Sequence, residues 1–225
     1  MITIASFPLI SALEFESACR KISERYQAGG HLQSDWEHVR LAQGYEESTV
    51  YLSITRTIQG AGGKPESPVK DNGELEAFEE IDEEALQLRV PANHGLMVEY
   101  DIVLSPTYQV PVLYFRIRDA GCALPPSIDT LYRYVIPKQF KSQVESFGII
   151  GGITMTEHPV TNLPVFFVHP CNTAAALEAS FHGREITSEQ YMQLWIGTVG
   201  WHVGLRVPIA IASDKTDHLS AEING

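Results

Sequence analysis

Cys171 occupies a position where a thiol could act as a nucleophile, and it is one of only three cysteines in the chain. The residues before it, Val165–Val168, form a short β-branched and aromatic run that is typical of a buried strand. His169 and Pro170 end this strand, because proline has no N–H for a strand ladder and fixes its own φ. The sequence therefore predicts that Cys171 lies in a rigid turn.

A short helix is predicted directly after this turn. Asn172 or Thr173 can cap it through a side-chain oxygen, and residues 174–178 can continue it. The positive end of a helix favours a thiolate, which makes Cys171 a candidate nucleophile. The alternative is that Cys171 is a small apolar filler, since free cysteine is among the most frequently buried residues.

Several cysteine chemistries can be compared with the residues around this thiol. A cysteine phosphatase needs an arginine six residues after its nucleophile, and that position is Leu177. A cysteine protease needs a histidine base, and nothing in the sequence marks His182 or His202 as one. A thiol that carries an acyl group as a thioester needs exposure, a turn and oxyanion donors, without a full triad. Acyl carriage is therefore the leading hypothesis, and a cysteine hydrolase is a weaker one.

The composition excludes several classes of partner. The formal net charge is −12, and half of it falls between Gly60 and Val90, where nine acidic residues face three basic ones. No basic stripe exists that could release phosphate counterions, so we expect no nucleic-acid partner. We also expect no metal and no cofactor, because the candidate ligands are too loosely spaced for a closed zinc set: His158, His169, Cys171 and His182.

The expected compartment is the cytoplasm. Few, scattered cysteines favour a reducing environment over a disulfide framework. The longest apolar windows, such as Ile196–Leu205, fall short of the roughly 18 to 20 apolar residues of a membrane helix, so no stable membrane insertion is expected. The N-terminal stretch MITIASFPLI has neither the basic region nor the cleavage site of a secretory signal.

Two amphipathic helices are predicted, one near each end of the chain. Ser11 and Glu14 have the spacing of a capping box, and so do Thr187 and Gln190. After the first box, apolar residues recur on one face at steps of three and four: Phe15, Ala18, Ile22 and Tyr26. After the second box, the stripe expected to face the core is Leu194, Thr198, Trp201 and Leu205, with Tyr191 and Val199 near it.

Strands are predicted between these helices. Residues 48–58, 96–105 and 106–118 each alternate apolar with polar positions. Ser105 and Pro106 supply a turn, so the last two runs predict a β-hairpin. Adjacent antiparallel strands with helices at both ends indicate an α+β fold, with a sheet covered on one face.

A glycine-rich, proline-rich and acidic stretch separates the first strand from the hairpin, and it is predicted to be a mobile insertion at about residues 60–92. Its loose helical spacing of apolar residues leaves a docking helix as an alternative to a solvated loop. The C-terminal residues, about 213–225, are predicted to form a polar, fraying tail.

The chain resembles the autophagy ubiquitin-like-conjugating enzymes at HPVTNLPVFFVHPCNT, residues 158–173. The hairpin YDIVLSPTYQVPVLYFRI, residues 100–117, is similar to the autophagy-related protein 10 family, as are residues 124–146 and 186–205. The sister family, autophagy-related protein 3, acts in conjugation to a lipid. The resemblance implies a variant of the ubiquitin-conjugating-enzyme fold, with an antiparallel sheet flanked by helices, in a single catalytic domain over residues 1–225.

The resemblance also implies a reaction. Autophagy-related protein 7, the activating enzyme, would pass the modifier autophagy-related protein 12 to Cys171 as a thioester. The modifier would then go to a lysine of autophagy-related protein 5, which this family binds directly. Two alternatives stay open, namely the lipid-conjugating sister acting on the autophagy-related protein 8 modifier, and a non-catalytic binding module of the same fold.

Three residues match the family's site. Cys171 matches the nucleophile, and Tyr108 matches a tyrosine that acts beside it. His169 stands where the family can have asparagine, and it could donate to an oxyanion or move a proton from the attacking lysine. Alternatively, Tyr108 is a sheet residue whose hydroxyl caps a neighbour, and His169 only fixes the turn.

The His-Pro-Asn motif of ubiquitin-conjugating enzymes proper is missing from the sequence. The other His-Pro pair, His158 and Pro159, is followed by Val160. The activating geometry is therefore expected to be local to Cys171, or to be supplied when the acceptor binds.

Overall fold

The computed structural model describes residues 2–29, 35–44, 49–58, 95–119, 121–136, 152–183 and 185–212. Its strands are β1 (Trp36–Gln43), β2 (Val50–Thr57), β3 (Met97–Leu104), β4 (Pro111–Asp119), β5 (Cys122–Ala123), β6 (Ile153–Glu157) and β7 (Pro164–Val168). Its α-helices are α1 (Ala12–Gln27), α2 (Ile128–Tyr134), α4 (Thr173–Ser180), α5 (Ser188–Val199) and α6 (Ile209–Ala212). Two 3₁₀ turns complete the elements, η2 (Pro170–Asn172) and η3 (Gly200–Val203).

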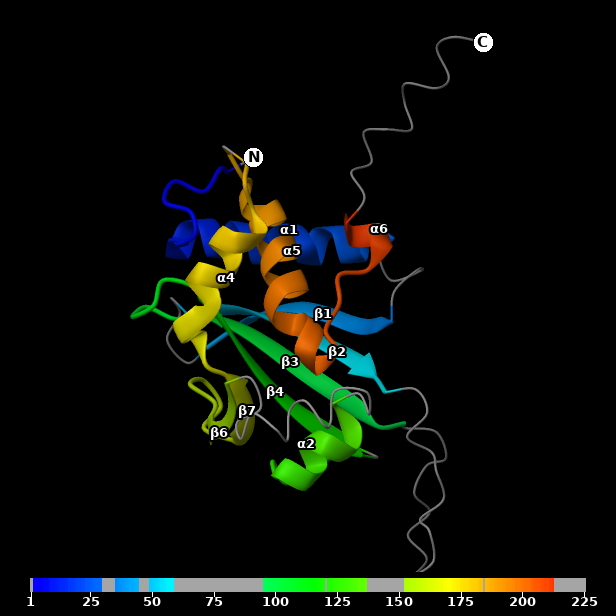
Figure 1. Cartoon of the computed structure of the whole chain (residues 1–225). Helices are drawn as coiled ribbons and strands as arrows, with labels where there is room; N and C mark the ends of the chain where they lie inside the picture. The colour runs from blue at the N-terminus through cyan, green and yellow to red at the C-terminus, as the bar shows by residue number, and fades with distance from the viewer. Residues whose placement is uncertain are drawn as a thin grey trace, which may run out of the picture.

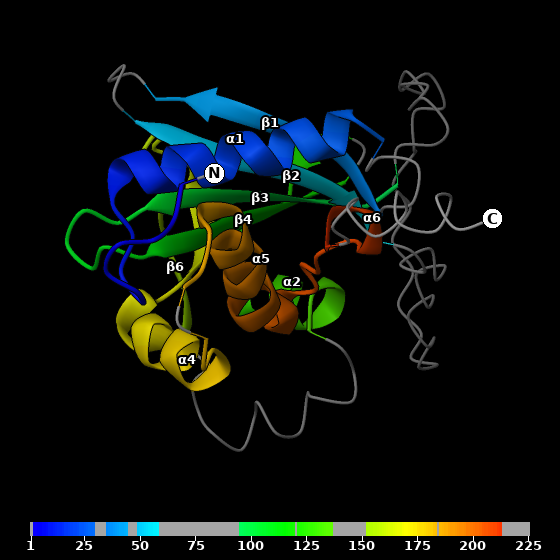
Figure 2. The same ribbon diagram turned by 90° about the horizontal axis from the view of Figure 1, so that it is seen from above.

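The strands form one antiparallel sheet in the order β1-β2-β3-β4-β7-β6, with β5 paired to β4. Figures 1 and 2 show α1, α4 and α5 on one side of this sheet. Residues of these helices and of α2 share a hydrophobic cluster with β2, β3, β4 and β7. The predicted α+β class, an antiparallel sheet covered by helices on one face, is confirmed.

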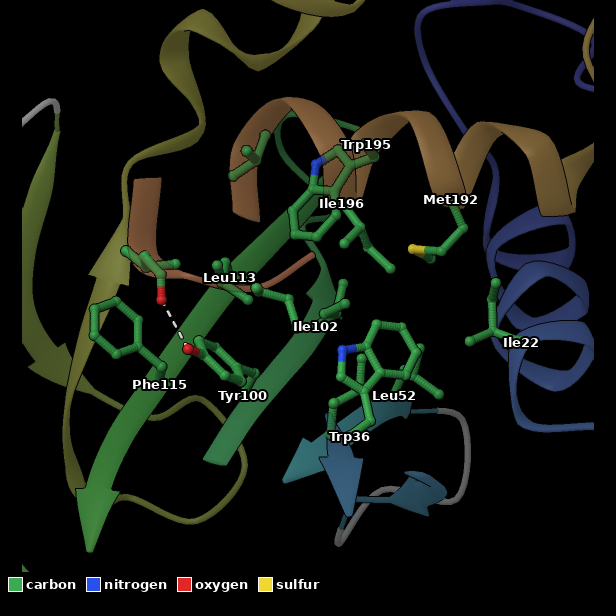
Figure 3. Packing of buried hydrophobic residues seen from close by; sticks show 14 of the residues in the cluster. Ile22, Trp36, Leu52, Tyr100, Ile102, Leu113, Phe115, Met192, Trp195 and Ile196 are labelled. Carbon is green, nitrogen blue, oxygen red and sulfur yellow. Dashed lines mark hydrogen bonds between the residues drawn. The ribbon is translucent and has the colours of Figure 1, made fainter. Parts of the chain in front are cut away.

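Alternation along the strands separates the two faces of the sheet. Leu52, Tyr100 and Ile102 point into the helix-covered core, together with Leu113 and Phe115 (Figure 3). The tyrosine hydroxyl in this core donates a hydrogen bond of 2.7 Å to the carbonyl of Val203, so it is buried without an unmet donor. The opposite face, called the rear face below, carries a smaller apolar cluster: Tyr51, Val103 and Val160, with Ala42 and Tyr114 packed against it.

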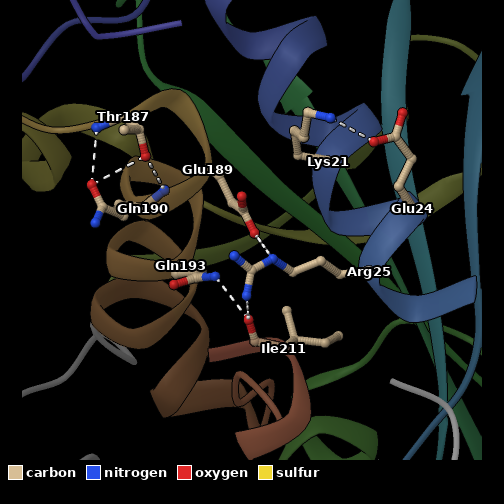
Figure 4. Close-up of polar contacts among 8 residues, drawn as sticks. All are labelled: Lys21, Glu24, Arg25, Thr187, Glu189, Gln190, Gln193 and Ile211. Carbon is tan, nitrogen blue, oxygen red and sulfur yellow. Dashed lines mark hydrogen bonds and ion pairs between the residues drawn. The ribbon is translucent and has the colours of Figure 1, made fainter. Parts of the chain in front are cut away.

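Both predicted capping boxes are present. Ser11 and Glu14 bond each other's backbone N–H at the start of α1, and Thr187 and Gln190 do the same at α5 (Figure 4). The predicted apolar face of α1 is buried as expected: Phe15, Ala18, Ile22 and Tyr26. Local capping chemistry thus sets where both long helices begin.

The predicted stripe of the second helix is partly wrong. The residues of α5 that reach the core are Tyr191, Met192, Trp195, Ile196 and Val199, whereas Leu194 and Thr198 are half-buried and Trp201 is 47% exposed. Inside α5 the buried face is centred on Trp195, so Leu194 and Thr198 lie at its margin. Trp201 is exposed because α5 ends at Val199 and η3 continues with three residues per turn, so the α-helical period no longer applies there. The Trp201 ring instead lies under the Arg206 guanidinium, 4.1 Å from the ring centroid.

The predicted hairpin is formed by β3 and β4, in register from Met97–Arg118 to Leu104–Pro111. Its second strand begins at Pro111 rather than at residue 106. Residues 105–110 form the connection, where Gln109 has a φ of 53° and its N–H bonds the Ser105 carbonyl at 2.8 Å. This connection carries Tyr108, so the residue lies in a turn and not in the sheet.

The N-terminal residues meet the segment that leads into α5. Thr3 and Thr187 form an isolated β-bridge, and the N–H of Ser188 bonds the carbonyl of Ile2 at 2.8 Å. Arg25 on α1 forms an ion pair with Glu189 on α5 (Figure 4). The fold is therefore closed by contacts between segments that lie far apart in the sequence.

Two sequence predictions fall on residues that are not described. The acidic insertion at about 60–92 and the tail at about 213–225 both lie outside the described residues. The assignment of residues 1–225 to a single domain therefore stays a prediction.

Candidate active site

The predicted strand before the thiol is β7, which lies between β4 and β6. It ends at Val168, and η2 places Cys171 in a 3₁₀ turn that leads into α4. Cys171 is exposed. It is therefore not the buried apolar filler that was the alternative, and its thiol is open to a partner.

His169 caps the turn η2, and α4 then begins with Asn172 as its N-cap residue, one of the two positions predicted from the sequence. The Cys171 N–H donates to His169 Nδ1 at 3.2 Å, while Asn172 makes no side-chain cap and the Thr173 N–H bonds the Pro170 carbonyl. Proline has no N–H, so the first backbone donor after the histidine is that of the cysteine itself. Because Nδ1 accepts this bond, the proton of a neutral His169 lies on Nε2.

Gly152 supports this turn and was missed from the sequence. It lies just before β6 with a φ of +83°, a conformation that favours glycine. The His169 N–H donates to the Gly152 carbonyl at 2.8 Å, and a Cβ at Gly152 would lie 3.7 Å from His169 Cβ. The Gly-Gly pair at residues 151–152 was the available signal, since such pairs mark turns.

The structure brings Tyr108 and His169 together, although 60 residues separate them. Their rings meet edge to face, with centroids 5.8 Å apart, and Phe167 lies on the histidine with centroids 6.0 Å apart. Tyr108 is 43% exposed, and its N–H donates to Ser105 Oγ at 3.2 Å. A phenol, an imidazole and the thiol's own turn thus gather at one end of β7.

The other two cysteines differ from Cys171 in their surroundings. Cys19 lies fully buried in α1, and burial raises the pKa of its thiol far above the ordinary range. Cys122 is exposed on β5, which pairs with the far end of β4. Of the three, only Cys171 is both exposed and placed at the start of a helix.

Neither a metal cluster nor a membrane-spanning helix is found in the described part of the chain. In it, no three His, Cys, Asp or Glu side chains gather as a metal ion would need. None of the helices described is both long and apolar enough to span a bilayer.

Comparison with known proteins identifies relatives. Residues 14–210 match the family described as autophagocytosis associated protein, active-site domain. The ubiquitin-like-conjugating enzyme ATG10 of Gibberella zeae is 32% identical over 238 residues, covering 93% of this chain and 99% of the relative. ATG10 of Arabidopsis thaliana is 28% identical over 211 residues, covering 87% and 91%. ATG10 of Homo sapiens is 30% identical over 140 residues, covering 61% and 62%.

Two solved structures are also similar. "Solution structures of KmAtg10" aligns with a TM-score of 0.46 at 12% identity, covering 89% of this chain and 99% of that one. "Crystal structure of Autophagic E2, Atg10" aligns with a TM-score of 0.40 at 14% identity, covering 85% and 97%.

The sequence matches define the class of this protein as the ubiquitin-like-conjugating transferases of autophagy. Within that class, the chain belongs to the ATG10 family. The family and the transferase activity predicted from the sequence are thereby confirmed.

Proposed function

We propose that Cys171 carries autophagy-related protein 12 as a thioester and delivers it to a lysine of autophagy-related protein 5. The observation that carries this proposal is an exposed thiol in a capped turn, beside Tyr108 and His169, in a chain of the ATG10 family. The relatives of that family are named as ubiquitin-like-conjugating enzymes.

The reaction has two transfers. In the first, the Cys171 thiolate attacks the thioester on the activating enzyme, autophagy-related protein 7, whose own thiolate leaves. In the second, a neutral lysine amine attacks the Cys171 thioester, an isopeptide bond forms, the amine loses a proton and the Cys171 thiolate leaves. Each transfer passes through a tetrahedral oxyanion that positioned donors stabilise. We place the reaction in the cytoplasm, where a free thiol persists.

His169 is proposed to donate to this oxyanion through Nε2–H. Its Nδ1 already accepts the Cys171 N–H, which argues against Nδ1 as the base that takes the lysine proton. Tyr108, whose ring meets the imidazole edge to face, is proposed to assist beside it. Its exposed position leaves the phenol free to contact the acceptor.

A loading assay tests the nucleophile. The protein is mixed with its activating enzyme, ATP and the modifier, and the products are separated with and without reductant. We expect a product heavier by one modifier that reductant removes, a reductant-resistant oxyester with Cys171→Ser, and no product with Cys171→Ala. Cys122→Ser is the matched control, since this thiol is also exposed and should load normally.

Two results would contradict the proposal. Normal loading of Cys171→Ala would move the nucleophile elsewhere. No loading of well-folded protein by a demonstrably active activating enzyme would indicate a binding module with an inert cysteine.

A further inference from the structure

β6 and β7 form an antiparallel hairpin whose second strand ends at the turn that carries Cys171. A second histidine, His158, is buried at the opposite end of this hairpin, in the turn between its two strands. His158 follows β6 directly and is 1% exposed. It packs on the rear face of the sheet, with its ring centroid 5.2 Å from that of Tyr114 on β4 and 5.8 Å from that of Tyr51 on β2. The β6–β7 turn therefore folds back across strands to which β6 is not paired.

The imidazole of His158 organises this turn. Its Nδ1 accepts two backbone N–H groups, those of Val160 at 3.1 Å and Thr161 at 3.2 Å. The Asn162 N–H bonds the His158 carbonyl at 2.9 Å, and Asn162 has a φ of 55°. A nitrogen that accepts two N–H groups carries no proton, so the turn requires a neutral ring with its proton on Nε2.

The other ring nitrogen links the turn to the centre of the sheet. His158 Nε2 faces Asp101 Oδ2 on β3 at 3.5 Å, and it makes no hydrogen bond to any described residue. Val160 joins Tyr51 and Val103 in the rear-face cluster. The side chains of the turn thus rest on β3 and β2, which lie three and four strands away from β6 in the sheet order.

This link matters because β7, although paired with β6 from Ile153–Val168 to Glu157–Pro164, has only a short ladder to the rest of the described sheet. In the described sheet, β4 and β7 are in register at Tyr114–Phe167 and Phe115–Phe166, whereas β3 and β4 are in register along their whole length. Because only these two pairs of the described residues join the β6–β7 hairpin to β4, the contacts of its turn with β2, β3 and β4 contribute much of what fixes the hairpin on the sheet. The strand that it fixes is the one that ends at Cys171.

The same bond recurs at both ends of the hairpin. In each His-Pro pair, the histidine Nδ1 accepts the N–H of the residue after the proline, which is Val160 in the first pair and Cys171 in the second. Both bonds require an unprotonated Nδ1. The β6–β7 turn at one end of the hairpin and the turn that carries Cys171 at the other are therefore both held by an imidazole with an unprotonated Nδ1.

We propose that His158 is a positioning residue for the transfer reaction. Its neutral imidazole clamps the β6–β7 turn and rests that turn on the rear face, so that β7 presents Cys171 in one position. Protonation at Nδ1 breaks the clamp and makes the transfer rate fall in acid. The effect on transfer rests on Cys171 being the thioester residue, whereas the clamp itself does not.

The groups around His158 make the neutral form the stable one. Burial lowers the pKa of His158, Asp101 opposes that change and Arg116 adds to it. Burial raises the pKa of Asp101, against the hydrogen bond from Ser53 and the charges of His158 and Arg116. The remaining groups that face this region from packed elements are Tyr51, Tyr114 and Glu99, the last of which is paired with Arg116 and Arg118.

Two substitutions of His158 distinguish the role of Nδ1 from that of Nε2. The amide oxygen of His158→Asn can take the place of Nδ1 and accept the turn N–H groups, as asparagine does in Asx-turns. The amide nitrogen of His158→Gln can reach toward Asp101, but the longer side chain loses the clamp. His202→Gln, at an exposed histidine, is the control for the substitution itself.

The readout is single-turnover transfer from preloaded enzyme to the acceptor. We expect His158→Gln to slow transfer about tenfold, because a displacement near 1 Å at a reacting group can cost up to about a hundredfold. We expect His158→Asn and His202→Gln to stay within about twofold of the wild type. Wild-type speed in His158→Gln, or equal losses in the Asn and Gln variants, would overturn the proposal.

A second measurement does not depend on catalysis. Amide NMR signals of Val160 and Thr161 are followed from pH 8 down to the pH at which the fold itself is lost, in the wild type and in His158→Asn. We expect both signals to move together in the wild type, as the clamp opens, and to stay still in the Asn variant. Still signals in both proteins would overturn the acid-sensitive clamp, even if the Gln variant failed to fold. If the wild-type signals move but no thioester forms on Cys171 in the loading assay, the proposed nucleophile is wrong while the clamp of His158 stands.

Discussion

His169 accepts a hydrogen bond from the backbone N–H of Cys171, the nucleophile that it is proposed to assist. Because Nδ1 is occupied by this bond, only Nε2 is left to act in the reaction. The side chain fixes the turn, as one hypothesis from the sequence held, and it also keeps Nε2–H free as a donor. An asparagine at this position could do both through its amide oxygen and nitrogen. This gives a physical reason why the family resemblance allows either residue there.

The first prediction compares two substitutions at His169. His169→Ala removes the cap of the Cys171 N–H and should lower the free energy of unfolding by about 1 kcal/mol. His169→Asn should keep the cap and unfold within about 0.5 kcal/mol of the wild type. Urea unfolding measures both. A loss in His169→Asn as large as that in His169→Ala would show that the ring, not the accepted bond, stabilises the turn.

The second prediction concerns the hydroxyl of Tyr108. Tyr108→Phe keeps the ring that meets His169, and the residue is 43% exposed, so stability should change by less than about 0.5 kcal/mol. If the hydroxyl acts in transfer, the single-turnover rate should fall about tenfold or more, with loading unchanged. Wild-type transfer in this variant would limit Tyr108 to holding the imidazole in place.

At the scale of elements, local chemistry was readable from the sequence and long-range chemistry was not. The starts of α1 and α5 depend on residues three positions apart, so Ser11–Glu14 and Thr187–Gln190 were both found. The exposure of Trp201 depends on where α5 gives way to η3. No spacing in the sequence marks that change of helical type.

The turn around Cys171 shows the same division between local features, which the sequence predicts, and long-range contacts, which it does not. The strand, the proline break and the following helix were predicted, because each follows from residue type. Asn172 is the N-cap residue of α4 as predicted, but its side chain makes no cap bond, and the side chain that holds the turn is His169, which is not among the common cap residues. The packing of His158 on β2, β3 and β4 joins residues between 40 and 110 positions apart in the chain, which no local pattern encodes.

The third prediction tests a capping box. Thr187→Ala removes the side-chain acceptor for the Gln190 N–H and should lower the free energy of unfolding by about 1 kcal/mol. Thr107→Ala, at an exposed turn position, is the control and should change it by less than about 0.5 kcal/mol. Equal effects in urea unfolding would mean that the box contributes nothing measurable to the start of α5.

At the scale of the whole molecule, the rear face carries a charge cluster that links stability to pH. Glu99 on β3 pairs with Arg116 and Arg118 on β4. Burial raises the pKa of Glu99, but the hydrogen bonds and charges of the two arginines outweigh it and hold that pKa below 4.5. A carboxyl with a lowered folded-state pKa stabilises the fold above its unfolded pKa, and this stabilisation is lost as pH falls through the folded value.

The fourth prediction follows from that linkage. The free energy of unfolding of the wild type should exceed that of Glu99→Gln by a constant amount above about pH 5.5. The difference should shrink as pH falls below the ordinary carboxyl value of 4.5. Urea unfolding between pH 7 and pH 3.5 measures it. A difference that grew in acid would contradict the direction of the pKa change.

The pairing of residues 2–4 with residues 186–188 also bears on how the chain is made. The α1 helix leaves the ribosome early, yet its partner α5 follows some 160 residues later in the chain. At about 5 to 20 residues per second, this delay lasts roughly ten to thirty seconds. During that time the face of α1 that will meet α5 has no native cover. Newly made chains should therefore need chaperone protection until the last helices emerge.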